Sequence, residues 1–151
     1  QHCKRDAGTE MYLFNVDKSS QVINLVTLDL CHFLVLVKVD NVQGRLHMAV
    51  QLIGTMADAG QYTYEFHVYN KNEPNRKFLL TDVCRSIYTP MDETFHETKT
   101  VSIPLSYATT FVNNNRVCYK LYIQKTDGET PRKARRRYGN NTAKGPNRNQ
   151  N

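Results

Sequence analysis

Histidine, cysteine, serine and paired carboxylates are the residues of this chain that could do chemistry, and their spacing assembles no reactive centre. The five histidines and four cysteines show no short metal-binding spacing, and no serine lies in a GxSxG setting. Asp92 and Glu93 lie in a stretch without periodicity, where a solvated pair is the ordinary explanation. The sequence therefore predicts no catalytic residue, cofactor or metal site within the fold, and we expect the domain to function by binding.

Most of these side chains have a structural explanation. His32 falls on an apolar strand face, which indicates a core histidine, and Cys31 and Cys118 lie inside apolar strands as buried free thiols. His2 and Cys3, adjacent at the start of the chain, could be the last ligands of a zinc site in an upstream segment; alone they cannot hold a metal. The other three histidines are expected at the surface: His47, His67 and His96.

The element that must position a binding site is the stretch 27–54, in which two apolar runs are joined by a polar loop containing Gly44. The stretch predicts a β-hairpin. From Leu28 to Val37, its first arm has apolar residues at both odd and even positions, and therefore on both faces of a strand. This pattern is typical of a strand buried on both faces. The second arm alternates, so one face of it should point to the core and the other to solvent. The expected core positions of that arm are Leu46, Met48, Val50 and Leu52, and the expected outer ones are His47, Ala49, Gln51 and Ile53.

Shorter β-prone segments flank this hairpin at regular intervals, separated by turn residues. Ser106 is expected to cap a brief helix over 107–112. Seven to eight strands with one short helix predict an all-β fold, an antiparallel β-sandwich. Besides the hairpin arms, the predicted strands are Met11–Val16, Gln21–Thr27, Gln61–Tyr69, Arg76–Thr81, Thr98–Ile103 and Arg116–Gln124.

The net positive charge comes from the end of the chain. Seven basic residues and no acids follow Pro131, whereas residues 1–130 carry 13 basic against 14 acidic residues, so the whole +6 belongs to the tail. The tail lacks the apolar residues needed to order it and is predicted to be disordered. Its basic cluster at 131–137 is typical of a nuclear-localisation signal or a solvated segment; binding of nucleic-acid phosphates is the alternative.

Several segments resemble one known family. They are HFLVLVKVDN from His32, LHMAVQLIGT from Leu46, RSI from Arg85, SIPLSYATTFVNNN from Ser102 and RVCYKLYI from Arg116. In this order they are similar to the C-terminal substrate-binding domain of the seven-in-absentia (SIAH/sina) E3 ubiquitin ligases. The resemblance implies a TRAF-like sandwich that forms homodimers and recruits protein partners. It also implies that the bound partners are ubiquitinated and degraded.

The resemblance also implies a domain plan. Residues 1–9 would end an upstream zinc-finger region, 10–127 would form the TRAF-like domain, and 128–151 the basic tail. The chain begins with Gln, so we expect a longer polypeptide, with a RING that recruits the ubiquitin-conjugating enzyme further upstream. A TRAF-like adaptor without ligase activity is the alternative. We expect a cytoplasmic protein, with nuclear entry through the tail, and no membrane association.

The resemblance places a peptide-binding groove along a strand edge and a neighbouring loop. Val22 and Asn24 stand where the family's groove has a tryptophan and a methionine, so pockets different from those for a Val-x-Pro peptide are implied. An extended peptide could add its backbone to this edge, and Asn24→Pro is expected to prevent this. The predicted peptide-binding residues are Val22, Ile23, Asn24, Leu25 and Val26, with Thr81, Asp82 and Arg85 in the loop.

Overall fold

The computed structural model describes residues 8–96, 100 and 102–126, which form nine strands and four short helical segments. None of these described helices is long enough to cross a membrane. The strands are β1 (Thr9–Phe14), β2 (Ser20–Leu28), β3 (Cys31–Asp40), β4 (Arg45–Leu52), β5 (Tyr62–Tyr69), β6 (Lys77–Val83), β7 (Arg85–Ser86), β8 (Ser102–Pro104) and β9 (Arg116–Lys125). The helices are α1 (Met56–Ala59), α2 (Met91–Thr94), α3 (Leu105–Ala108) and the 3-10 helix η1 (Thr109–Phe111).

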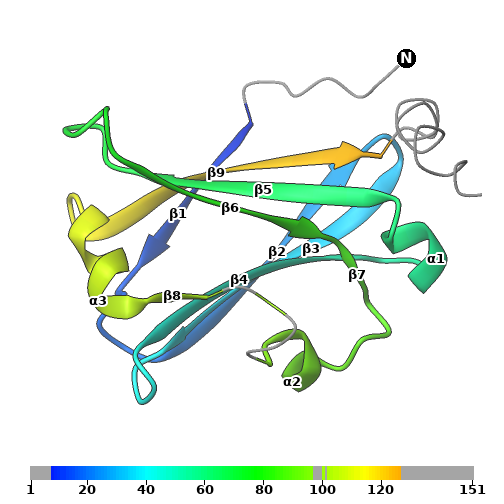
Figure 1. The fold of residues 1–151 in the computed structure, drawn as a ribbon, viewed down its shortest axis with the longest axis horizontal. Coiled ribbons are helices and arrows are strands. Elements are labelled where there is room, and N and C mark those ends of the chain that lie inside the picture. The colour runs from blue at the N-terminus through cyan, green and yellow to red at the C-terminus, as the bar shows by residue number, and fades with distance from the viewer. Residues whose placement is uncertain (1–7, 97–99, 101, 127–151) are drawn as a thin grey trace, which may run out of the picture.

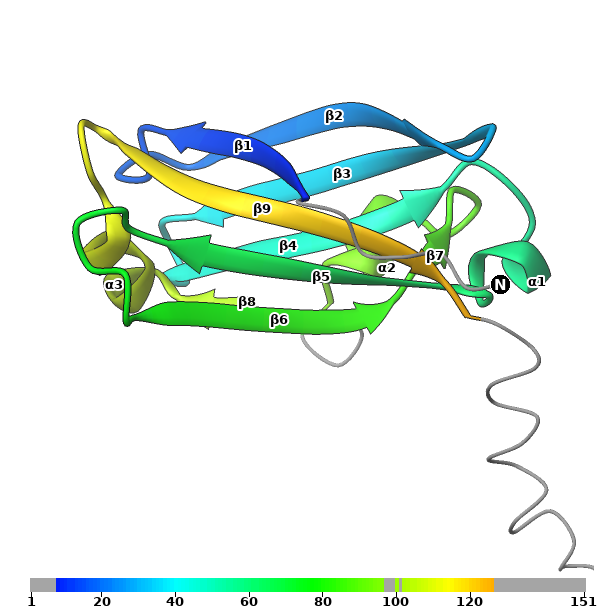
Figure 2. The ribbon, with the colours of Figure 1, turned by 90° about the horizontal axis from the view of Figure 1, so that it is seen from above.

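The strands pack as a sandwich of two sheets, which confirms the predicted fold class (Figure 1). One, the β9 sheet, has the order β1-β9-β5-β6. The other, the β3 sheet, has the order β2-β3-β4-β7, and β8 also pairs with β4. Figure 2 shows β1 and β2 along one margin of the sandwich and β6 and β8 along the other. The sequence indicated seven to eight strands, and the strand that it missed, β7, has only two residues.

The core lies between the two sheets, as the alternation of apolar and polar residues along the strands predicted. Phe33, Val35 and Val37 of β3 are fully buried against the inner face of the β9 sheet. On that face, the Phe66 ring lies edge-on to Tyr64 and Tyr119, with ring centroids 5.4 and 5.8 Å apart. Such edge-to-face aromatic pairs add to the stabilisation from burial.

The strand buried along both faces is β4, not the first arm of the predicted hairpin. The four expected core residues of β4 are buried, but so are His47, Ala49 and Gln51 on its outer face. The segment after β7 covers them: Phe95 packs on Ala49 and Leu36, and the Gln51 amide donates to the Thr94 hydroxyl at 2.9 Å. Ile53, just beyond β4, is exposed as expected.

The first arm is also divided by a turn that the sequence pattern did not indicate. Leu28 pairs with Cys31, so β2 and β3 are joined by only two residues, Asp29 and Leu30. Their φ angles of 51° and 67° are those of a type I′ hairpin turn, which normally carries Asn-Gly or Asp-Gly. Leucine is unusual there, so the expected signal was absent.

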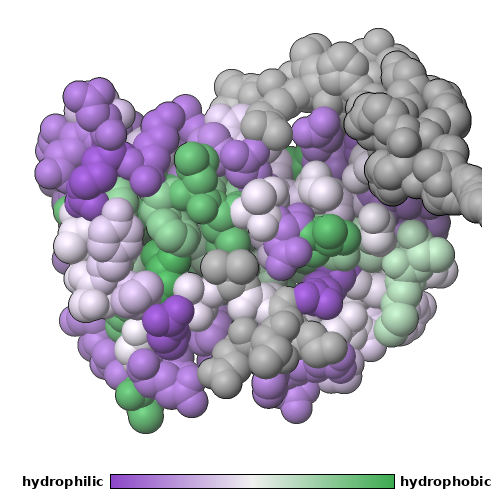
Figure 3. Space-filling model, in the orientation of Figure 1, coloured by the Kyte–Doolittle hydropathy of each residue, from purple (hydrophilic) through white to green (hydrophobic). Residues whose placement is uncertain are grey.

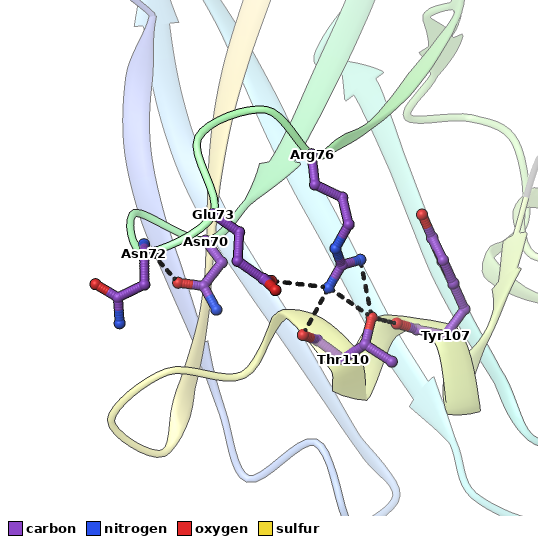
Figure 4. A network of polar contacts seen from close by, with 6 residues as sticks. All are labelled: Asn70, Asn72, Glu73, Arg76, Tyr107 and Thr110. Atoms are coloured by element: carbon purple, nitrogen blue, oxygen red, sulfur yellow. Dashed lines mark hydrogen bonds and ion pairs between the residues drawn. The ribbon is translucent and has the colours of Figure 1, made fainter.

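One end of the sandwich is closed by α3 and η1, held by Arg76 (Figure 4). Arg76 donates to the Thr110 carbonyl at 2.8 Å and to the Thr110 hydroxyl, and its guanidinium lies 4.0 Å from the centroid of the Phe111 ring. Glu73 also pairs with it at 3.2 Å. The predicted helix over 107–112 begins earlier than expected, at Leu105, and its N-cap is Pro104 rather than Ser106.

Residues 1–7 and 127–151 lie outside the described residues. The proposed zinc-ligand role of His2 and Cys3 and the predictions for the tail therefore stay predictions. The predicted strand Thr98–Ile103 corresponds to β8, which begins at Ser102, although residues 97–99 and 101 are also outside the described set.

Candidate functional site

The free edge of β2 is the feature of this fold best suited to binding a partner. Among the residues that the structure describes, β2 is hydrogen-bonded only to β3, so its other side ends the sheet. Its nine residues, SQVINLVTL, include no charged residue, proline or glycine. Charged side chains, proline or a short length normally protect an edge strand from pairing with other chains. β2 carries none of these protections.

The register determines which backbone groups of β2 are free. Since Leu28 and Cys31 close a two-residue turn, they form a hydrogen-bonded pair, and such pairs alternate along the ladder. Val22, Asn24 and Val26 therefore bond to β3, whereas Ile23 and Leu25 direct their N–H and C=O groups away from it. The expectation for Asn24→Pro is wrong for this reason: that proline would break the β2–β3 ladder instead of blocking the free edge.

The two faces of β2 differ. Val22 and Val26 point inward and pack against the main core, with Asn24 half-buried between them. Ile23 and Leu25 point outward and are 49% and 63% exposed. Each apolar outer side chain lies beside another on β3, because Ile23 is opposite Leu36 and Leu25 is opposite Leu34. A strand added here would meet apolar side chains on both faces and one amide.

The other predicted binding residues lie elsewhere. Thr81 and Asp82 belong to β6, at the far margin of the other sheet, and Arg85 belongs to β7, which pairs with β4. Two strands, β3 and β4, separate β7 from β2. The expectation that these residues form a loop next to Val22–Val26 is therefore wrong. The chain crosses between the sheets at Cys84, and it does so at the opposite side of the sandwich from β2.

The other long edge, β6, is better protected than β2. It carries the charged residues Lys77 and Asp82, and the Asp82 carboxylate accepts the backbone N–H of Val83 at 2.7 Å. Leu79 and Val83 are exposed on it. On the face seen in Figure 1, hydrophobic patches alternate with hydrophilic ones (Figure 3). The edge strand β1 is shorter, with six residues, and carries Glu10. Among the described edges, β2 is the long one without charge.

Two histidines lie where the sequence did not predict them. His32 is exposed on β3, and its Nδ1 lies 2.9 Å from the Thr27 hydroxyl. His47 is only 6% exposed and packs edge-on against Phe95. Within the described residues, no carboxylate bonds to His32 to orient it as a general base. The Thr27–His32 pair thus lacks the third member of a catalytic triad.

The three described thiols offer no activated nucleophile either. Cys84 and Cys118 are buried, and Cys31 is half-buried, with its sulfur 3.3 Å from the Tyr62 hydroxyl. Burial raises the pKa of Cys84 to about 12, which leaves the unreactive thiol form at neutral pH. Within the part of the chain that the structure describes, no three His, Cys, Asp or Glu residues are grouped to hold a metal.

Comparison with known proteins agrees with this arrangement. No curated protein matches the chain. The family model described as "Sina, TRAF-like domain" matches residues 28–122, from the end of β2 into β9. The match covers more than half of the chain and includes strands of both sheets, but it leaves out β1 and all of β2 except Leu28. It indicates a domain for protein interaction and substrate binding. The chain therefore belongs to the Sina, TRAF-like domain family.

Proposed function

We propose that this domain recruits partner proteins by adding an extended segment of the partner as a new strand on the free edge of β2. The observation that carries the proposal is the unprotected, uncharged edge of nine residues, with the free N–H and C=O groups of Ile23 and Leu25 along it. In strand addition, such main-chain groups supply affinity and the side chains on either face supply specificity. Val22, Asn24 and Val26 would contact the partner from the inner face.

The test removes one free N–H without removing the ladder. In Leu25→Pro the lost N–H is one that faces away from β3, a position at which an edge strand tolerates proline. Leu25→Ala is the matched control, because it removes the same side chain and keeps the N–H. We expect partner capture from a lysate to be retained by Leu25→Ala and lost by Leu25→Pro. Equal capture by the two folded variants would contradict strand addition.

We further propose that the domain selects substrates for a RING-type E3 ubiquitin ligase of the sina type. Membership of the Sina, TRAF-like family supports this, and the ligase chemistry and any zinc would belong to segments upstream of the domain. A TRAF-like adaptor without ligase activity is the second candidate. Ubiquitination of a captured partner by the complete natural protein, with an E2 enzyme and ubiquitin, would favour the ligase. Capture of the partner without transfer of ubiquitin would favour the adaptor. For either function we propose a location in the cytoplasm or nucleus.

We also propose that two copies associate through the outer face of the β3 sheet. Ile23 and Leu25 are exposed there, and Leu34 beside them is half-buried, so an apolar strip is left uncovered by the α2 segment. Burial of such a strip against its own copy would remove it from water. Sedimentation should show a dimer at micromolar concentration that Leu34→Glu converts to a monomer. A monomeric parent domain would contradict the proposal.

A further inference from the structure

Asn24 is the polar residue on the inner face of β2, between two valines that pack against the core. Its side chain is half-buried, and among the described residues it has no hydrogen-bond partner. At an open edge, water can bond to this amide. An amide that loses its water must find another partner, because an unpaired buried polar group is costly.

A strand added to β2 would change the surroundings of this amide. In an antiparallel addition, Ile23 and Leu25 would exchange backbone hydrogen bonds with the new strand, as their free groups require. Asn24 would then lie in a non-hydrogen-bonded pair, in which the two Cα atoms are about 4.5 Å apart and the side chains approach most closely. The residue opposite Asn24 would therefore cover the amide and displace its water.

We propose that Asn24 determines the specificity of the edge by selecting a partner segment with a hydrogen-bonding side chain opposite it. The proposal rests on strand addition to β2. Serine, threonine, asparagine or glutamine at that position can bond to the amide, whereas an aliphatic residue leaves it unpaired. Two residues to either side, the segment faces Val22 and Val26 and is apolar. The recognised pattern is apolar-x-polar-x-apolar in extended conformation.

The experiment selects random nine-residue peptides displayed on phage against the domain and against Asn24→Leu, a substitution of similar shape without the amide. The wild-type pool should be enriched in the pattern above, with a polar centre. In fluorescence anisotropy, replacing that centre by valine should weaken binding to wild type by about tenfold or more. The same replacement should strengthen binding to Asn24→Leu. Circular dichroism confirms that each variant is folded.

The outcomes separate the specificity from the proposed function. If both peptides bind wild type with equal Kd and Leu25→Pro abolishes binding, strand addition stands and the role of Asn24 is refuted. If Leu25→Pro binds as tightly as Leu25→Ala, strand addition at β2 is refuted and the role of Asn24 with it. If no peptide is enriched on wild type, both are contradicted.

Discussion

Replacing Arg76 by alanine should destabilise the domain, because this side chain joins the β5–β6 loop to η1. Its hydrogen bond to the Thr110 carbonyl is charge-assisted and contributes about 1.5 kcal/mol at a half-exposed site. Its position 4.0 Å from the Phe111 ring centroid adds about 0.5 kcal/mol. The exposed ion pair with Glu73 adds roughly nothing. We expect a loss of about 2 kcal/mol in the free energy of unfolding, or about 8 °C in Tm.

Urea denaturation and thermal melting of Arg76→Ala measure this loss. Arg76→Lys keeps the charge but loses the planar fork, so it should show more than half of the effect. Lys71→Ala is the control, because Lys71 is an exposed neighbouring cation whose ion pair with Glu10 spans 3.9 Å. We expect it to change stability by less than about 0.5 kcal/mol. An Arg76→Ala variant as stable as Lys71→Ala would refute the reasoning.

Two further substitutions test local features. Leu30 is 95% exposed with a φ of 67°, so Leu30→Gly should stabilise the domain by about 0.5 kcal/mol: relief of left-handed strain outweighs the added chain entropy. A less stable Leu30→Gly in urea would contradict this. Burial, followed by the charge of Lys38, lowers the pKa of His47 from its ordinary 6.5. The unfolded chain therefore binds this proton more readily, and the stability present above about pH 6.5 falls as the pH is lowered. His47→Gln should lose less stability between pH 7 and 5, and parallel pH profiles would count against this.

The fold class followed from alternation, because period-2 patterns such as Tyr62 to Val68 are imposed by a strand with one buried face. The alternation did not reveal what covers the outer face. His47, Ala49 and Gln51 appeared to be solvent-facing because the segment that buries them, around Phe95, lies about 45 residues further along the chain. Such coverage depends on tertiary packing that no local pattern encodes.

The free edge at which we propose binding was predicted only in part. Val22–Val26 is indeed at the end of a sheet, as its position before an apolar strand indicated. Which of its amides are free depends on the two-residue turn at Asp29–Leu30, and leucine at a positive φ concealed that turn. The resemblance predicted Asp82 and Arg85 in a loop beside this edge, whereas they belong to β6 and β7 at the opposite side of the sandwich.

Amide hydrogen exchange along β2, measured by NMR with and without a bound partner peptide, tests the central claim most directly. In the free domain, the amides of Val22, Asn24 and Val26 should exchange slowly, because they bond to β3, and those of Ile23 and Leu25 should exchange quickly. Partner binding should slow Ile23 and Leu25. Unchanged exchange at both, with new protection in β1 or β6 instead, would contradict strand addition to β2.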